Sequence, residues 1–211
     1  YAQAMLDGTI PYEAQEKYLN IILSETDRLT NLTSNLLELN SFNGDNVLLD
    51  IATFNICETI IQTVNTLEGT AAKKEISFVL DFNTQKELLV EADESKIHQV
   101  LYNLIDNAVK FSHNNSEIKI SLRKKGVKVF VSVKDSGIGI PKESLNKVFD
   151  RFYKTDISRG KDKRGTGLGL SISKEIIQAH NQTINVVSTL GVGTEFVFTL
   201  KYHSKKQEAS S

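Results

Sequence analysis

The sequence predicts an α+β protein: a two-layer α/β sandwich in which helices cover a mostly antiparallel sheet, preceded by one long helix. Three observations lead to this prediction. Helical and strand-like segments succeed one another from residue 55 to residue 201. An uninterrupted helical pattern occupies residues 12–41. Two glycine runs, at residues 135–139 and 165–169, bracket an aromatic and basic loop. We expect these runs to form a binding site on the sandwich.

The long helix carries one apolar stripe with the alternating three- and four-residue steps of a coiled-coil seam. The stripe consists of Tyr18, Ile22, Leu29, Leu32, Leu36 and Leu39, and Glu25 interrupts it. Pro11 suits the start of the helix, and Asn43-Gly44 suits its end. A single amphipathic helix needs a partner for its stripe. The partner is an upstream helix, a second chain, or both, and residues 1–9 are interpreted as the tail of that upstream helix.

The remaining elements are predicted from hydrophobic periodicity and turn residues. Residues 45–54 are expected to be a linker, and Asp93 is expected to cap the second helix. Helices are predicted at 55–73, 93–111 and 168–180, and strands at 76–82, 88–91, 118–123, 127–133, 184–187 and 195–201. The polar tail, residues 204–211, is expected to fray.

Composition narrows the functional class. The chain has 211 residues, of which 40% are hydrophobic and 24% charged, with a formal net charge of -1. This balance argues against nucleic acid as a partner. The only cysteine, Cys57, cannot form an internal disulfide and is interpreted as an inert core thiol. No apolar run approaches the ~20 residues that span a bilayer, so no direct membrane contact is expected.

Asn103 and Asn107 are four residues apart on a predicted helix, so their side chains project from one face, close to Lys110. An amide oxygen is a neutral hard ligand for Mg²⁺, which keeps phosphate and water oxygens as its other ligands. Taken alone, the pair is better explained as two hydrogen-bonding surface asparagines.

Asp135 ends a strand immediately before Gly137 and Gly139, which would let the backbone approach a flat ring closely. A carboxylate at this place can accept the exocyclic amine of adenine, a charge-assisted bond worth roughly 1.5–3 kcal/mol. Guanine carries an oxygen there and would be rejected. Taken alone, a simple Asp-Ser-Gly turn explains these residues better.

The second glycine run opens a helix, where backbone amides make an anion site. Its spacing is neither that of a P-loop nor that of a dinucleotide-binding unit. The loop before it carries cations that could meet a triphosphate, although Lys161 and Lys163 are interpreted as solvated. This loop contains Phe149, Arg151, Phe152, Tyr153, Lys154, Arg159, Lys161, Lys163 and Arg164.

In this order the motifs resemble those of bacterial sensor histidine kinases of two-component systems. Residues 98–112 resemble the N box, 135–141 the first glycine box, 148–154 the F box and 165–171 the second glycine box. The resemblance covers about residues 54–200. It implies a Bergerat (GHKL ATPase/kinase) fold that binds ATP and Mg²⁺, with residues 1–44 as part of a dimerisation and phosphotransfer hairpin and 45–203 as the catalytic domain.

The resemblance also assigns roles. Asn103, Lys110 and Lys154 are expected to be catalytic, and Asn107 is expected to bind Mg²⁺. The expected nucleotide-binding residues are Asn103, Asn107, Lys110, Phe111, Asp135, Gly137, Ile138, Gly139, Ile140, Phe152, Tyr153, Lys154, Gly165, Thr166, Gly167, Leu168, Gly169 and Leu170. The family's acceptor histidine lies upstream of Tyr1, and none of His98, His113, His180 and His203 stands in a similar setting.

Two departures from related patterns are informative. The family often has His-Gly-Gly where this chain has His180-Asn181-Gln182, and Asn tolerates the left-handed helix end. Related gyrase-type and chaperone-type ATPases carry a glutamate that activates water, four residues before the Mg²⁺ asparagine. Here that position is Asn103, an amide without useful basicity, so hydrolysis is expected to be slow.

We therefore interpret the chain as the catalytic core of a protein-histidine kinase that transfers the γ-phosphoryl of Mg-ATP to an upstream histidine, for relay to a response-regulator aspartate. Expected partners are ATP, a second copy bound through the N-terminal helix, and a receiver domain. The expected location is the cytoplasm, with the parent protein anchored in the membrane. The alternatives are a GHKL-type ATPase, a serine kinase, or a nucleotide-binding module without phosphotransfer.

Overall fold

The computed structural model describes residues 1–41, 48–82, 87–155 and 165–204. Within these ranges a seven-stranded sheet carries helices on one face, which confirms the predicted two-layer sandwich. The helices are α1 (Ala2–Leu6), α2 (Tyr12–Ser41), α3 (Ile56–Ala72), α4 (Glu94–Phe111) and α6 (Gly169–Ala179), with a short 3-10 helix at Lys142–Ser144. The strands are β1 (Ala52–Asn55), β2 (Ser77–Asp81), β3 (Leu89–Ala92), β4 (Glu117–Lys125), β5 (Lys128–Lys134), β6 (Ile184–Thr189) and β7 (Gly193–Tyr202).

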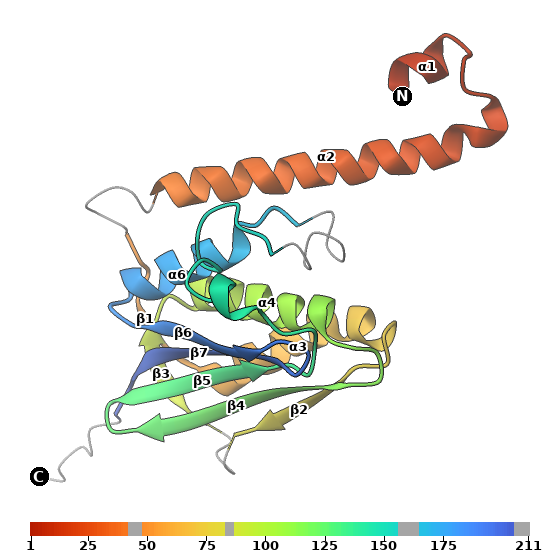
Figure 1. Cartoon of the computed structure of the whole chain (residues 1–211). Helices are drawn as coiled ribbons and strands as arrows, with labels where there is room; N and C mark the ends of the chain where they lie inside the picture. The colour runs from red at the N-terminus through yellow and green to blue at the C-terminus, as the bar shows by residue number, and fades with distance from the viewer. Residues whose placement is uncertain (42–47, 83–86, 156–164, 205–211) are drawn as a thin grey trace, which may run out of the picture.

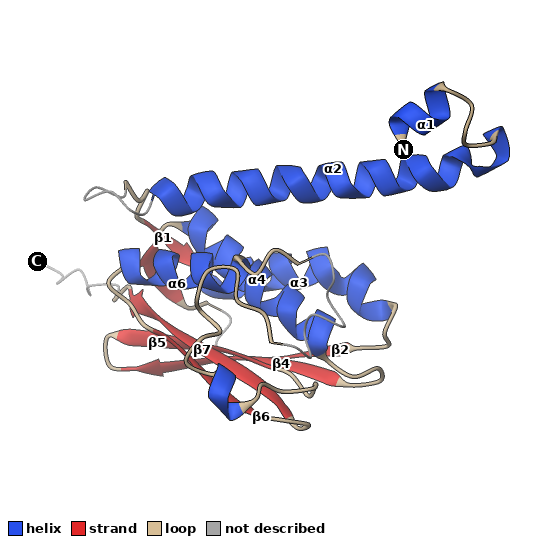
Figure 2. Cartoon of the chain, turned by 45° about the horizontal axis from the view of Figure 1, so that its top comes forward, coloured by secondary structure: helices blue, strands red, loops and turns tan. Residues whose placement is uncertain are grey.

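The strand order is β1-β3-β7-β5-β4-β2, with β6 also paired to β7. All of these pairs are antiparallel except β2 with β4. Figures 1 and 2 show α3, α4 and α6 on the same face of the sheet, with α2 lying across the outer side of these helices. No helix in the described ranges is long and apolar enough to cross a membrane.

Helix α4 forms because its apolar residues recur at helical spacing and bury one face. Ile97, Leu101 and Leu104 are fully buried between α4 and the sheet. As predicted, Asp93 caps the helix: its carboxylate accepts the Lys96 backbone N–H at 3.1 Å. The opposite face of α4, which carries Asn103 and Asn107, therefore remains free to line a site.

One predicted boundary was wrong. Residues 45–54 were expected to be a linker, but Ala52–Asn55 is the edge strand β1 and pairs with β3 from Ala92 to Leu89. Four residues are too few to display a period of two, so the sequence pattern was not visible. The predicted domain boundary at 44/45 and most of the predicted tail lie outside the described residues.

The N-terminal residues form two helices, the short α1 and the long α2. Helix α1 falls within residues 1–9, and the Tyr1 and Tyr18 ring centroids are 5.0 Å apart. On α2 the stripe residues Tyr18, Ile22 and Leu32 are half-buried, whereas Leu29 is 60% exposed. The side chain of Leu39 lies outside the described part. Part of the predicted seam thus remains uncovered within this chain.

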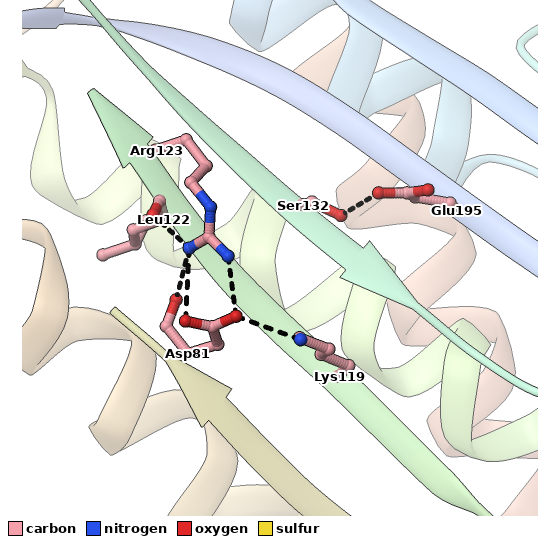
Figure 3. Close-up of polar contacts among 6 residues, drawn as sticks. All are labelled: Asp81, Lys119, Leu122, Arg123, Ser132 and Glu195. Carbon is pink, nitrogen blue, oxygen red and sulfur yellow. Dashed lines mark hydrogen bonds and ion pairs between the residues drawn. The ribbon is translucent and has the colours of Figure 1, made fainter. Parts of the chain in front are cut away.

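The other face of the sheet is polar and carries no helix in the described ranges. Figure 3 shows Asp81 on β2 accepting from Arg123 Nη2 at 2.7 Å and lying 3.0 Å from Lys119 Nζ. Ser132 on β5 donates to Glu195 on β7 at 2.5 Å. The ion pairs of Asp81 lie at the surface, where water screens them, so they contribute little to stability. These contacts join neighbouring strands.

Candidate nucleotide-binding site

A cavity of about 730 Å³ lies between α4, the start of α6 and the ends of β5 and β7. It brings together most of the residues predicted from the glycine runs and the asparagine helix. The predicted residues that line it are Asn103, Asn107, Lys110, Phe111, Asp135, Ile138, Gly139, Ile140, Tyr153, Lys154, Gly165, Thr166, Gly167, Gly169 and Leu170. The predicted residues that share this cavity are up to 67 positions apart in the sequence (Asn103 and Leu170).

Three predicted residues do not line the cavity but shape its walls. Gly137 packs against the Phe111 backbone, and a Cβ atom there would overlap the Phe111 carbonyl. Leu168 is fully buried in the core. Phe152 adopts a positive φ of 63°, its backbone N–H donates to Gly167 O at 3.0 Å, and its ring is 56% exposed.

The structure adds lining residues that the sequence interpretation missed. They are Ser24, Asp27, Arg28 and Asn35 on α2, Gln99, Tyr102, Asp106 and Ala108 on α4, and Val148, Thr155, Thr194 and Phe196. Gln99 and Asp106 lie four before and three after Asn103, so helical spacing could have found them. The α2 residues carry no such signal, because the sequence does not show which face of α2 rests over the cavity.

Asp135 is 6% exposed and its carboxylate is fixed by backbone donors. Its Oδ1 atom accepts Gly137 N–H at 2.9 Å and Thr194 N–H at 3.2 Å. Among the described residues, none hydrogen-bonds to Oδ2. Burial raises the pKa of Asp135 to about 6, against the two backbone bonds and the nearby His113, which lower it. One oxygen is therefore held while the other remains available to a ligand.

The β6–β7 hairpin sets the path of the first glycine run. Gly139 has a φ of 67°, and a Cβ atom there would overlap the Thr189 carbonyl. Gly191 N–H donates to Ile138 O at 2.8 Å, and Ile140 N–H donates to Ser188 Oγ at 2.8 Å. Glycine is needed at 139 because the backbone turns left-handed in direct contact with another strand.

The asparagine face lies beside the start of α6. Asn103 Nδ2 donates to Gly169 O at 3.1 Å and lies 3.3 Å from Ser173 Oγ. Asn107 is half-buried and lines the cavity. Lys110 Nζ lies 2.7 Å from Asp106 Oδ2. The predicted loop cations Arg159, Lys161, Lys163 and Arg164 lie outside the described residues.

The histidines agree with structural roles. His180 is the C-cap of α6. Its Nε2 accepts the Asp93 N–H at 2.9 Å, and its Nδ1 lies 2.8 Å from Ile176 O. Asn181 follows with a φ of 56°, the left-handed helix end predicted for this departure from His-Gly-Gly. His203 pairs with Glu91 at 3.0 Å, and His113 is exposed.

The chain is similar to known proteins in both sequence and structure. Residues 92–204 match the family described as histidine kinase-, DNA gyrase B- and HSP90-like ATPase. The chain is 34% identical over 213 residues to the sensor histidine kinase WalK of Bacillus subtilis (strain 168), covering 99% of this chain and 34% of that protein. The chain thus spans about a third of this curated relative.

Solved structures give the same result. The catalytic domain of histidine kinase ThkA is 35% identical, with a TM-score of 0.64 over 72% of this chain and 95% of that one. Histidine kinase ThkA, solved in complex with response regulator protein TrrA, is 32% identical with a TM-score of 0.74. This match covers 94% of this chain and 54% of that one. Full-length ShkA, solved in complex with AMPPNP, is 26% identical to this chain. The TM-score is 0.79, and the match covers 90% of this chain and 39% of ShkA. The chain therefore belongs to the histidine kinase-, DNA gyrase B- and HSP90-like ATPase family, in which its relatives are sensor histidine kinases.

Proposed function

We propose that this chain is the ATP-binding catalytic core of a two-component sensor kinase, which passes the γ-phosphoryl of ATP to a histidine outside the chain. The observation that carries the proposal is Asp135: a buried carboxylate with one oxygen held by two backbone N–H groups and the other left for a ligand. An acceptor fixed in this way suits the exocyclic amine of adenine. The match of ShkA, solved with AMPPNP, is consistent with it.

The phosphate end of the cavity would hold Mg²⁺ through Asn107. In the described part of the chain, no group of three or more His, Cys, Asp or Glu side chains could hold a metal by itself. A single amide oxygen fits an ion that takes its other ligands from phosphate and water. The bound ion would neutralise phosphate charge, while Lys110 and Lys154, which also line the cavity, would hold the triphosphate.

Phosphoryl transfer to imidazole is favoured over hydrolysis because of Asn103. Its side-chain nitrogen donates to Gly169 O, so the group ties α4 to the start of α6. An amide cannot remove a proton from water, whereas histidine brings its own basic nitrogen. The site would then contribute position and charge neutralisation to an in-line transfer.

The partners follow from the same proposal. Residues 1–44 would belong to a dimeric phosphotransfer hairpin, 45–203 would form the catalytic domain, and residues 204–211 would form a frayed tail. A receiver domain would accept the phosphoryl group, as the complex of ThkA with TrrA suggests. The parent protein would act in the cytoplasm from a membrane anchor. Phosphorylation assays of the whole protein with its regulator would contradict this if no label reached an aspartate.

Replacing Asp135 by Asn tests the proposed function. Asn keeps an oxygen for the Gly137 and Thr194 N–H groups but presents an amide to the adenine amine. We expect Asp135→Asn to weaken ATP binding at least tenfold, which corresponds to about 1.4 kcal/mol, in calorimetric titrations with Mg²⁺ present.

Asp150→Asn is the matched control, because Asp150 is exposed and does not line the cavity. Its affinity for ATP should equal that of the unmodified chain. Equal affinity in Asp135→Asn would overturn the adenine assignment, and absence of ATP binding in the unmodified chain would overturn the proposed function.

A further inference from the structure

Helix α4 ends abruptly beside the site, and every one of its last four carbonyl groups has a hydrogen-bond donor. Ala108 O accepts Ser112 N–H at 2.9 Å, and Phe111 O accepts Ile138 N–H at 3.2 Å. The two carbonyls between them accept from one side chain: Lys74 Nζ donates to Val109 O at 2.8 Å and to Lys110 O at 2.6 Å. Carbonyls at a helix end otherwise lack partners inside the helix.

Lys74 is brought to this place by the chain that follows α3. Its own carbonyl accepts Asn115 N–H at 3.0 Å, so the connection after α3 is tied to the connection after α4. The side chain is half-buried. Its ammonium group faces the negative end of the α4 dipole, where a cation is stabilising. The contact is therefore both a hydrogen-bonded cap and a charge complement.

The first glycine run packs against the capped end of α4. Ser112 leaves the helix in an extended conformation, with ψ 153°, and forms an antiparallel bridge with Gly137. Gly137 N–H in turn donates to Asp135 Oδ1. Lys74 is thus linked to the Asp135 carboxylate through backbone contacts: Lys74 contacts the end of α4, the Gly137–Ile138 segment packs on that end, and Gly137 bonds to Asp135.

We propose that Lys74 is a positioning residue for adenine recognition: by capping α4 it fixes the Phe111–Ser112 backbone on which the Asp135–Ile138 loop is registered. Lys74 does not line the nucleotide cavity, so it acts through this backbone and not by touching the ligand. The inference takes its ligand, adenine, from the proposed function. The fixing of the Asp135–Ile138 loop by the Lys74 cap does not depend on a ligand.

The first experiment needs no nucleotide. Hydrogen exchange in the ligand-free chain should be faster for residues 135–140 in Lys74→Met than in the unmodified protein, by about tenfold or more. Lys73→Met is the matched control: it removes the same charge one residue away, from an exposed side chain that caps α3 through its backbone. Equal exchange in Lys74→Met and Lys73→Met would overturn the proposal.

The second experiment measures base discrimination. Inosine triphosphate keeps the sugar and phosphates of ATP but has an oxygen in place of the amine. In the unmodified chain the ratio of the dissociation constants, inosine triphosphate to ATP, should be at least ten. Lys74→Met should reduce this ratio at least threefold, Lys73→Met should leave it unchanged, and Lys74→Arg should restore most of it because guanidinium also donates to carbonyls.

The ratio separates positioning from general destabilisation. A variant that is merely less stable loses affinity for both nucleotides by the same factor, which leaves the ratio unchanged and contradicts the proposal. If Lys74→Met does not fold by circular dichroism, Lys74→Gln, which keeps a donor and removes the charge, decides the question with an intermediate ratio expected. If the unmodified chain binds neither nucleotide, the proposed function fails. The hydrogen-exchange measurement still tests whether the Lys74 cap fixes residues 135–140.

Discussion

At the scale of single residues, Asp135 combines a structural cost with a proposed binding role. Its pKa of about 6 lies above the ordinary value of 3.8, because burial disfavours the charged form more than the two backbone N–H groups favour it. The unfolded chain ionises near the ordinary value. Between these values the folded state binds more protons, so stability falls as pH rises from about 4 to about 6, and the penalty is complete above 6.

This sign gives a prediction for the ligand-free protein. Asp135→Asn should raise the melting temperature at pH 7.5, since it removes the buried charge and keeps an acceptor for both N–H groups. Two units of pKa correspond to about 3 kcal/mol at most, and each kcal/mol to about 2–4 °C for a chain of this size. The gain should shrink when the scan is repeated at pH 5.

Asp150→Asn again serves as the control, with a pH-independent change close to zero expected in thermal scans. A melting temperature of Asp135→Asn that is lower than that of the unmodified chain at pH 7.5 would contradict the burial argument. The same substitution is thus expected to stabilise the empty protein and to weaken its complex with ATP, a combination that a purely structural aspartate would not show.

Residue patterns in the sequence predicted most of the residues that line the cavity. Neither the Asn103–Asn107 spacing nor the position of Asp135 at a strand end predicts a site by itself. The two features together with the glycine runs, in this order along the chain, predicted that these groups meet. What the sequence could not show was the distribution of hydrogen bonds. That Asn103 Nδ2 is taken by Gly169 O, and that Asp135 keeps one oxygen open, depend on contacts between segments 59 or more residues apart (Asp135 with Thr194).

At the scale of elements, α2 presents an incomplete interface. Leu29 and Leu36, which belong to the predicted stripe, are 60% and 37% exposed in the isolated chain. An apolar helix face of this kind is stabilised when a second helix covers it. The hairpin partner supplied by α1 has only five residues and reaches only the beginning of α2.

We therefore expect the chain to dimerise through α2 at high concentration, as measured by light scattering. Leu29→Glu should lower the dimer fraction, because it places a charge in the covered stripe. Thr30→Glu adds the same charge on the adjacent, exposed position and should have a smaller effect. A strictly monomeric chain, or equal effects of the two variants, would contradict a dimer built on this stripe.

Elements also differ in how far sequence predicts them. Helices α3, α4 and α6 and strands β4 to β7 have enough residues for their periodicity to be read. Strand β1 does not, and it forms because Phe54 is buried in the core and because β3 offers an open edge. Its position depends on tertiary contacts, which local pattern does not encode.

At the scale of the whole molecule, the chain places a nucleotide-sized cavity beneath α2. Ser24, Asp27 and Arg28 of α2 line the same 730 Å³ as Asn103 and Asp135. The order of motifs predicted the two-layer fold and its family, since each motif has a fixed place in that fold. The docking of α2 over the cavity was not predictable, because an amphipathic helix offers several faces and the sequence does not rank them.

Our proposal implies that the chain holds the γ-phosphoryl group for an external imidazole and does not give it to water. The most direct measurement is incubation of the purified chain with Mg²⁺ and γ-³²P-ATP, recording both inorganic phosphate and acid-labile label on the protein. We expect bound ATP, slow phosphate release and no label on His98, His113, His180 or His203. Rapid phosphate release, label on any of these histidines, or failure to retain ATP would contradict it.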